Sequence, residues 1–211
     1  MNCVCSEALI SPALDWPAVR DLPLRLGILA SGNGSNFAAI AQAIDQGQLC
    51  AQIQGVIYNN PQARVAQRAA ERGLPSVLIN HRDFGGRETF DATVAATLRG
   101  WDVDWVIMAG WMRCATPVLL DAFPGHILNI HPSLLPSFPG LHAVEQALRA
   151  GVTITGCTVH IVTLAVDQGP IIAQAAVPIF GGDTPDTLAR RIHTQEHQLY
   201  PWAIALAAGR A

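Results

Sequence analysis

Short apolar segments alternate with segments of helical character along most of the chain, and this alternation limits its fold more than any other feature. The run Leu24–Ala30 precedes a helical pattern at about Phe37–Gln46, and a second strand is expected at Gln52–Tyr58. The continuous apolar run Trp105–Ala109 is typical of a central strand covered on both faces. Repeated units of this kind predict a doubly wound α/β fold, a mostly parallel sheet with helices on both faces.

The C-terminal half of the chain carries a different pattern. Thr153–Val162 is rich in β-branched residues and Ile171–Val177 is strand-like, which predicts a strand pair in another orientation. One long helix is expected from Thr184 to about Ala208, with an interruption at Pro201. The remaining expected elements are a strand at Ser76–Ile79 and helices at Ala63–Arg72, Arg87–Arg99 and His142–Ala150, the last closing at Gly151.

Chain length and composition restrict the domain organisation and the partners. The 211 residues suffice for one domain with a sizeable core, and we expect an N-terminal extension at 1–22 and one folded domain at 23–211. The extension lacks the basic start and apolar centre of a signal peptide. A net charge of −3 gives no reason to expect nucleic acid or an acidic membrane as a partner, and no apolar run is long enough to span a bilayer.

The five cysteines favour a reducing compartment. Cys3 and Cys5 resemble a metal or redox pair, but no second pair completes a zinc pattern. The odd total and the scattered positions of the others favour reduced thiols in the cytoplasm over a disulfide framework.

A glycine-rich turn, Ser31-Gly32-Asn33-Gly34-Ser35-Asn36, lies between the first strand and the first helix. Strand, glycine turn and helix together make a phosphate cradle, because backbone amides at a helix N-terminus hold anions. The turn is neither a full dinucleotide fingerprint nor a Walker loop, and a tight turn with Ser35 or Asn36 as N-cap is the alternative. The second strand ends without an acid that could hold an adenosine ribose, which favours a single phosphate over a nicotinamide cofactor.

The stretch Ile127–His142 carries the candidate catalytic side chains. Asn129 and His131 lie two residues apart, so they share one face of a strand that Pro132 ends. Asp167 lies in a later loop, before Gly169-Pro170. Each of the three has a purely structural alternative, yet Asn, His and Asp together beside a phosphate cradle form a plausible acyl-transfer site. The sequence His193-Thr194-Gln195-Glu196-His197 matches the inverted zinc-protease motif, but no acid follows Glu196, so we expect no metal site there.

The sequence resembles the glycinamide ribonucleotide formyltransferases, which belong to the folate-dependent formyltransferases, over nearly all of 24–208. The resemblance lies in the glycine turn, in Ala109-Gly110-Trp111-Met112-Arg113, in Asn129-Ile130-His131-Pro132-Ser133-Leu134-Leu135-Pro136, in Val166-Asp167-Gln168-Gly169-Pro170 and in Thr194-Gln195-Glu196-His197.

This resemblance implies formyl transfer from 10-formyltetrahydrofolate, a co-substrate, to the amine of glycinamide ribonucleotide in purine synthesis. It implies that Asn129, His131 and Asp167 are catalytic. It further implies that Gly34, Ser35 and Asn36 hold the phosphate, that Glu196 holds the ribose hydroxyls, and that the folate contacts Met112, Arg113, Cys114 and Val166. No metal is implied, and the expected partners are these small molecules, with a monomer or a homodimer as the assembly.

Three positions depart from the pattern of many relatives: Ser137 replaces Lys, Gln168 replaces Gly, and His193 replaces Gln. Three alternatives remain open. A 10-formyltetrahydrofolate hydrolase normally has a further N-terminal domain, for which 1–22 is too short. A transfer-RNA formyltransferase would need an RNA-binding domain, and a non-catalytic folate-binding module would not need the three catalytic residues.

Overall fold

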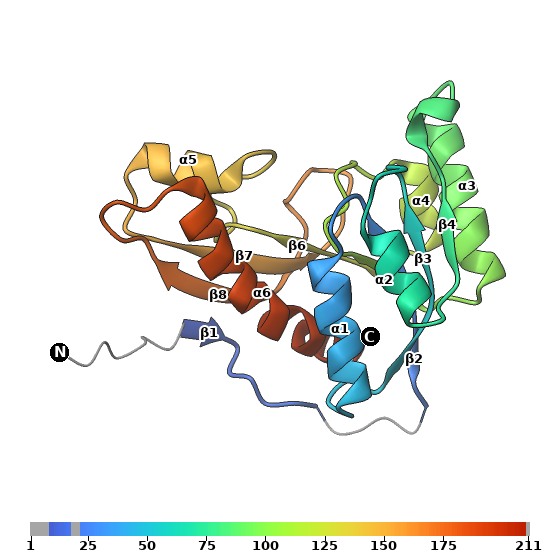
Figure 1. Ribbon diagram of the computed structural model, residues 1–211, viewed down its shortest axis with the longest axis horizontal. Coiled ribbons are helices and arrows are strands. Elements are labelled where there is room, and N and C mark those ends of the chain that lie inside the picture. Colours follow the sequence, from blue (N-terminus) through green and yellow to red (C-terminus); the bar gives the residue numbers. More distant parts are fainter. Residues whose placement is uncertain (1–8, 18–21, 210–211) are drawn as a thin grey trace.

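A twisted sheet forms the centre of the computed structural model, which describes residues 9–17 and 22–209 (Figure 1). Within these residues the sheet has eight strands in the order β1-β8-β7-β6-β5-β2-β3-β4. The strands are β1 (Leu9–Ser11), β2 (Leu24–Ala30), β3 (Ala51–Tyr58), β4 (Ser76–Leu78), β5 (Trp105–Met108), β6 (Ile127–His131), β7 (Ile154–Ile161) and β8 (Ile171–Pro178).

Helices cover both faces of this sheet, because the strands alternate their buried side chains between the two. Leu26 and Ile28 of β2 join one cluster of buried residues, whereas Leu29 of the same strand joins another. The first cluster includes residues of α1 (Ser35–Asp45), α2 (Val65–Glu71) and α6 (Pro185–Ala208); the second includes residues of α3 (Arg87–Gly100) and α4 (Pro117–Ala122). The doubly wound α/β fold predicted from the sequence is confirmed. The remaining helices are α5 (Ala143–Ala150) and the 3-10 turn η1 (His81–Asp83).

The sheet has a parallel part and an antiparallel part. The strands from β6 through β5, β2 and β3 to β4 are parallel to one another. β7 is antiparallel to both β6 and β8. The different orientation expected for the strands of the C-terminal half is therefore confirmed, and β6 lies where the two parts meet.

The first helix begins earlier than expected, and its N-cap is neither of the two residues offered in the alternative to the phosphate cradle. Gly34, not Ser35 or Asn36, is the N-cap of α1 and has a left-handed backbone, with φ 73°. A Cβ atom at Gly34 would lie 2.7 Å from Cγ2 of Val65 in α2, so glycine is required both for its conformation and for this close packing. Consequently Ser35 and Asn36 both lie in the first turn of the helix.

The predicted interruption of the last helix was wrong, because α6 continues through Pro201. Proline removes one main-chain hydrogen bond, but its neighbours Tyr200 and Trp202 are almost completely buried. The Tyr200 hydroxyl lies 3.1 Å from the carbonyl oxygen of Met108 and 3.0 Å from that of Leu128. Tertiary packing therefore holds the helix together where its local sequence opposes it.

Strand pairing and a side-chain hydrogen bond join the described part of the N-terminal segment to the domain. Strand β1 pairs with β8 at the edge of the sheet, and Nε1 of Trp202 donates a hydrogen bond of 2.9 Å to the carbonyl oxygen of Asp15. The division into 1–22 and 23–211 remains a prediction. Cys3 and Cys5 lie outside the described residues, and among those described no helix is long and apolar enough to cross a membrane.

Candidate active site

The carboxyl ends of β5 and β6 open into a cavity of about 320 Å³, where ligands of open α/β sheets bind. Asn129 and His131 of β6 both line it, as their spacing predicted, and Asp167 reaches it from the loop between β7 and β8. The structure thus brings together the three side chains predicted to be catalytic. Their separation of up to 38 positions in the sequence is closed by the antiparallel pairing of β6 with β7.

Both ring nitrogens of His131 face hydrogen-bond acceptors. Nε2 lies 2.8 Å from the carbonyl oxygen of Phe138, and Nδ1 lies 3.3 Å from Oδ2 of Asp167. The two side chains are buried, with exposed fractions of 7% for His131 and 9% for Asp167. Since a carbonyl can only accept, Nε2 must carry a hydrogen, and a second hydrogen on Nδ1 satisfies the carboxylate. The arrangement therefore suits a protonated imidazole paired with an ionised Asp167.

His160 completes this cluster and was not identified from the sequence. It stands opposite Asn129 in the pairing of β6 with β7. Its Nε2 atom lies 3.3 Å from Nδ2 of Asn129 and 3.6 Å from Oδ1 of Asp167, while its Nδ1 lies 2.9 Å from the carbonyl oxygen of Ile161. Because that carbonyl can only accept, Nδ1 of His160 carries a hydrogen, and Nε2 faces both the Asn129 amide and the Asp167 carboxylate.

The environment of Asp167 favours its charged form. Burial alone would raise the pKa of this carboxyl, but the hydrogen bond to His160, the N–H of Gly140 and the charge of His131 together hold the pKa below its ordinary value. The Gly140 amide donates to Oδ2 at 2.8 Å. Asp167 itself has a left-handed backbone, with φ 55°, a conformation that non-glycine residues adopt at some energetic cost.

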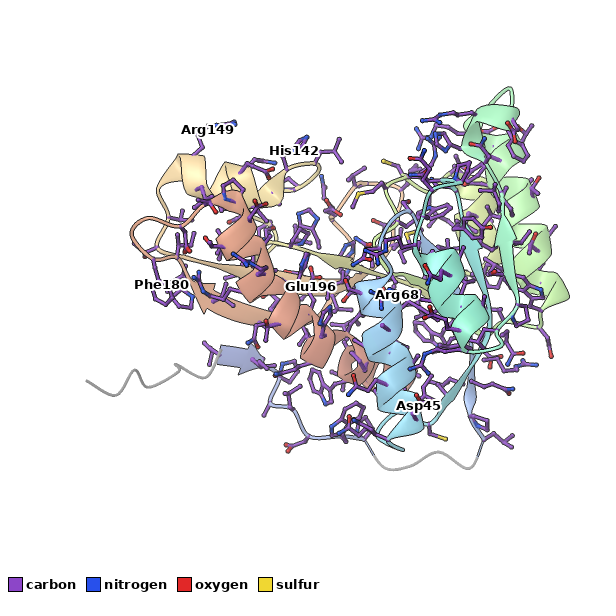
Figure 2. The ribbon with its side chains drawn as sticks, viewed as in Figure 1. Asp45, Arg68, His142, Arg149, Phe180 and Glu196 are labelled. Atoms are coloured by element: carbon purple, nitrogen blue, oxygen red, sulfur yellow. The ribbon has the colours of Figure 1, made fainter. Side chains whose placement is uncertain are left out.

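The residues predicted to bind the ribonucleotide gather at the N-terminal end of α1. Nδ2 of Asn36 donates a hydrogen bond of 3.0 Å to Oε2 of Glu196, which α6 places beside that end (Figure 2). Both side chains are buried, and Oδ1 of Asn36 has no hydrogen-bond partner within the described residues. Burial raises the pKa of Glu196, although Asn36, His193 and His131 oppose this effect. A ligand with several hydroxyl donors would satisfy these acceptors.

Gly34 and Ser35 supply the start of this helix, and basic side chains lie around it. Arg68 of α2 donates from Nε to the carbonyl oxygen of Asn33 at 2.8 Å and lies beside the same end of α1 (Figure 2). Nε2 of His193 lies 4.0 Å from Oε2 of Glu196. The amide groups of the first turn and the neighbouring guanidinium of Arg68 favour an anion such as phosphate.

The four residues predicted to contact the folate line the same cavity as the catalytic group. Met112 and Val166 are 69% and 45% exposed, and Cys114 is also exposed, so the cavity mouth offers apolar surface to a ligand. Arg113 lies with its Cζ atom 5.5 Å from the ring centroid of Phe90. The main-chain N–H of Met112 donates to Oγ of Ser31 at 2.9 Å, which connects this pocket to the glycine turn.

The motif at His193–His197 has a different arrangement from that of a zinc protease. The rings of His193 and His197 are stacked, with centroids 6.4 Å apart, while Glu196 points to Asn36. Across residues 9–17 and 22–209, no group of three or more His, Cys, Asp or Glu side chains is arranged to hold a metal ion.

Chemically, the site combines hydrogen-bond donors aimed at one cavity with a carboxylate that can accept a proton. The amide of Asn129 and a protonated His131 can stabilise an oxyanion, and Asp167 can take part in proton transfer. The first turn of α1, which suits an anion, and the buried carboxylate of Glu196, which suits hydroxyl donors, lie on neighbouring helices. These features fit acyl transfer between a ligand in the cavity and a phosphorylated ligand beside α1.

Comparison with known proteins gives a consistent result. Residues 24–204 match the formyl transferase family. The phosphoribosylglycinamide formyltransferase of Bacillus subtilis is 42% identical over 185 residues, which cover 88% of this chain and 95% of that protein. A crystal structure of glycinamide ribonucleotide transformylase 1 from Symbiobacterium toebii superposes with a TM-score of 0.88 and 44% identity, covering 94% of each chain.

Longer relatives contain a matching segment. The trifunctional purine biosynthetic protein adenosine-3 of Drosophila pseudoobscura is 47% identical over 189 residues, but these cover 89% of this chain and only 14% of that protein. The chain therefore spans a small part of the trifunctional relatives and nearly the whole of the bacterial one.

Proposed function

The chain belongs to the formyl transferase family, and from this membership we propose that it transfers the formyl group of 10-formyltetrahydrofolate to the amine of 5′-phosphoribosylglycinamide in purine biosynthesis. Its full-length bacterial relatives carry the name of this activity. The main support for the proposal is the pairing of His131 with Asp167 beside Asn129, in a cavity near the N-terminal end of α1.

In the proposed reaction the glycyl amine attacks the formyl carbon, and negative charge develops on the formyl oxygen. Asn129 donates to this oxygen from its amide. His131 donates from Nδ1–H, whose contact with Asp167 is long enough, at 3.3 Å, to be shared with a second acceptor. Losing one such donor typically costs about 100- to 1,000-fold in rate.

Asp167 has two tasks in this proposal. Its charge keeps His131 protonated, and its carboxylate relays the proton of the attacking amine, through water, to the leaving nitrogen of the folate. The left-handed backbone at Asp167 and the hydrogen bond from Gly140 fix the direction of the carboxylate. The proposed mechanism includes neither a metal ion nor a covalent acyl-enzyme.

The two substrates are held on either side of Asn129, His131 and Asp167. Gly34, Ser35 and Asn36 bind the phosphate through the first turn of α1, and Glu196 accepts hydrogen bonds from the ribose hydroxyls. Met112, Arg113, Cys114 and Val166 line the folate side. The proposed setting is the cytoplasm, with these small molecules as partners, no nucleic acid or membrane, and a monomer or homodimer as the assembly.

Incubation with 10-formyltetrahydrofolate, with and without the ribonucleotide, tests this function. We expect loss of the formyl group to depend on the ribonucleotide. Equal loss in its absence would instead identify a hydrolase, in which water replaces the amine.

A further inference from the structure

The main-chain carbonyl of Phe138 competes with Asp167 for hydrogens on the His131 ring. It accepts from Nε2 at 2.8 Å, at the opposite end of the ring from the carboxylate. A neutral imidazole has one N–H, so it can satisfy only one of these two acceptors, whereas an imidazolium satisfies both. The position of a single backbone carbonyl therefore helps to decide whether His131 carries the positive charge that the reaction needs.

Phe138 cannot hold that position by its own conformational preference. Its φ of 56° places it in the left-handed region, which is unfavourable for a bulky aromatic residue. A strained residue of this kind persists only where its surroundings fix it. The contacts that hold Phe138 therefore also hold the carbonyl that accepts from His131.

Ser133 provides this fixation. Its side chain is completely buried, and its hydroxyl lies 2.5 Å from the carbonyl oxygen of Ser137 and 3.3 Å from that of Phe138. We propose that Ser133 is a positioning residue for formyl transfer, which holds the 137–138 turn so that the Phe138 carbonyl keeps Nε2 of His131 protonated. This inference rests on the proposed function. Because the contact at Ser137 is to its main chain, the change from Lys at that position leaves it intact.

Ser133 is itself fixed from the neighbouring strands. Oγ1 of Thr158 in β7 donates to the carbonyl oxygen of Ser133 at 2.7 Å and accepts from the N–H of Leu135 at 3.0 Å. Gln174 of β8 donates to the same Thr158 hydroxyl at 3.0 Å. A continuous set of hydrogen bonds thus runs from β8 through β7 to the serine, and the serine transmits the rigidity of the sheet to the His131 ring.

The test is Ser133→Ala, examined by ¹⁵N NMR of histidine-labelled protein at neutral pH, with the His131 signals assigned from a His131→Ala spectrum. In the wild type we expect both ring nitrogens of His131 to be protonated. In Ser133→Ala we expect the hydrogen to be lost from Nε2 and kept on Nδ1, beside Asp167. We also expect kcat to fall about tenfold, the equivalent of one hydrogen bond, with KM for the ribonucleotide unchanged.

Two further variants make the result interpretable. Thr155→Val removes a buried hydroxyl that has no hydrogen-bond partner in the described structure, so its NMR signals and kcat should match the wild type. Ser133→Cys replaces the hydroxyl by a larger and weaker donor and should lie between serine and alanine, and it also serves if the alanine variant does not fold. A folded Ser133→Ala or Ser133→Cys with both nitrogens still protonated and kcat unchanged would overturn the proposal. Absence of ribonucleotide-dependent transfer in the wild type would refute the function, while the NMR comparison would still decide the role of Ser133.

Discussion

The side-chain amide of Asn36 donates a hydrogen bond of 3.0 Å to the carboxylate of Glu196, although the two residues are 160 positions apart in the chain. This contact joins the first turn of α1 to the middle of α6. It places the N-terminal end of a helix beside a buried carboxylate, a combination that suits a ribose phosphate. In the proposed function, Asn129, His131 and Asp167 act on the group that this ribose carries.

Replacing Glu196 by Gln should weaken ribonucleotide binding. The neutral amide accepts the ribose hydroxyls less strongly than a carboxylate, so we expect KM for the ribonucleotide to rise about tenfold or more, with kcat changed less. Steady-state kinetics would measure this, with the exposed Glu71→Gln as control. A KM within twofold of the wild type would contradict the assigned role.

The same variant should change how stability depends on pH. Burial raises the pKa of Glu196, so its contribution to stability is complete below the ordinary glutamate value of about 4.3 and is lost as pH rises through the folded-state pKa. Glu196→Gln carries no such penalty. We therefore expect its Tm to exceed that of the wild type at pH 8 by more than at pH 4, measured by thermal unfolding; a pH-independent difference would argue against a buried carboxylate.

His131→Ala and Asp167→Asn should each reduce turnover by several orders of magnitude while the chain stays folded. In the proposed mechanism the first removes an oxyanion donor, and the second removes both the charge that keeps His131 protonated and the proton acceptor. Single-turnover rates with circular dichroism as a folding check would measure this. Near-normal activity in either variant would show that the residue is not catalytic.

Asp183 should stabilise the turn between β8 and α6 without affecting catalysis. Hydrogen bonds from Arg191 and from the N–H of Phe180 hold the pKa of Asp183 well below its ordinary value, against the effect of burial. We expect Asp183→Asn to lower the free energy of unfolding by about 1–3 kcal/mol at pH 7. Because the pKa is depressed, this difference should shrink as pH falls below about 3.9. Urea unfolding would measure it, with the first-turn variant Asp186→Asn expected to change stability less.

The two thiols Cys114 and Cys157 should differ in reactivity. Burial, reinforced by the charge of Glu196, raises the pKa of Cys157, whereas Cys114 is exposed and lines the cavity. We expect iodoacetamide to modify Cys114 before Cys157, and a folate analogue to slow modification of Cys114. Peptide mass spectrometry would measure both rates, and modification of Cys114 unaffected by the analogue would place the folate elsewhere.

The layered fold could be predicted from the sequence because strand and helix periods are local properties. Two details were wrong for the same physical reason, which is that tertiary packing overrides local preference. At Gly34 a left-handed glycine packed closely against Val65 is the N-cap of α1, and at Pro201 the burial of Tyr200 and Trp202 carries α6 past a proline.

The sequence predicted which residues form the candidate site, but not how all of their side chains and main-chain groups are arranged. Asn129 and His131 could be paired from their spacing on one strand, and Asp167 could be named as a loop carboxylate, a role that the family resemblance then supported. His160 was missed because its position beside Asn129 depends on the register between β6 and β7, which no local pattern encodes. The contact between Phe138 and His131 was missed because it involves a main-chain carbonyl, which leaves no signal in the residue types.

The most direct test of the central claim is the fate of an isotopically labelled formyl group. With [¹³C-formyl]-10-formyltetrahydrofolate and the ribonucleotide both present, NMR of the products would measure how the label divides between the formylated ribonucleotide and free formate. The proposed mechanism predicts nearly all of the label on the glycyl nitrogen. Label found mainly in formate would contradict it and identify water as the acceptor.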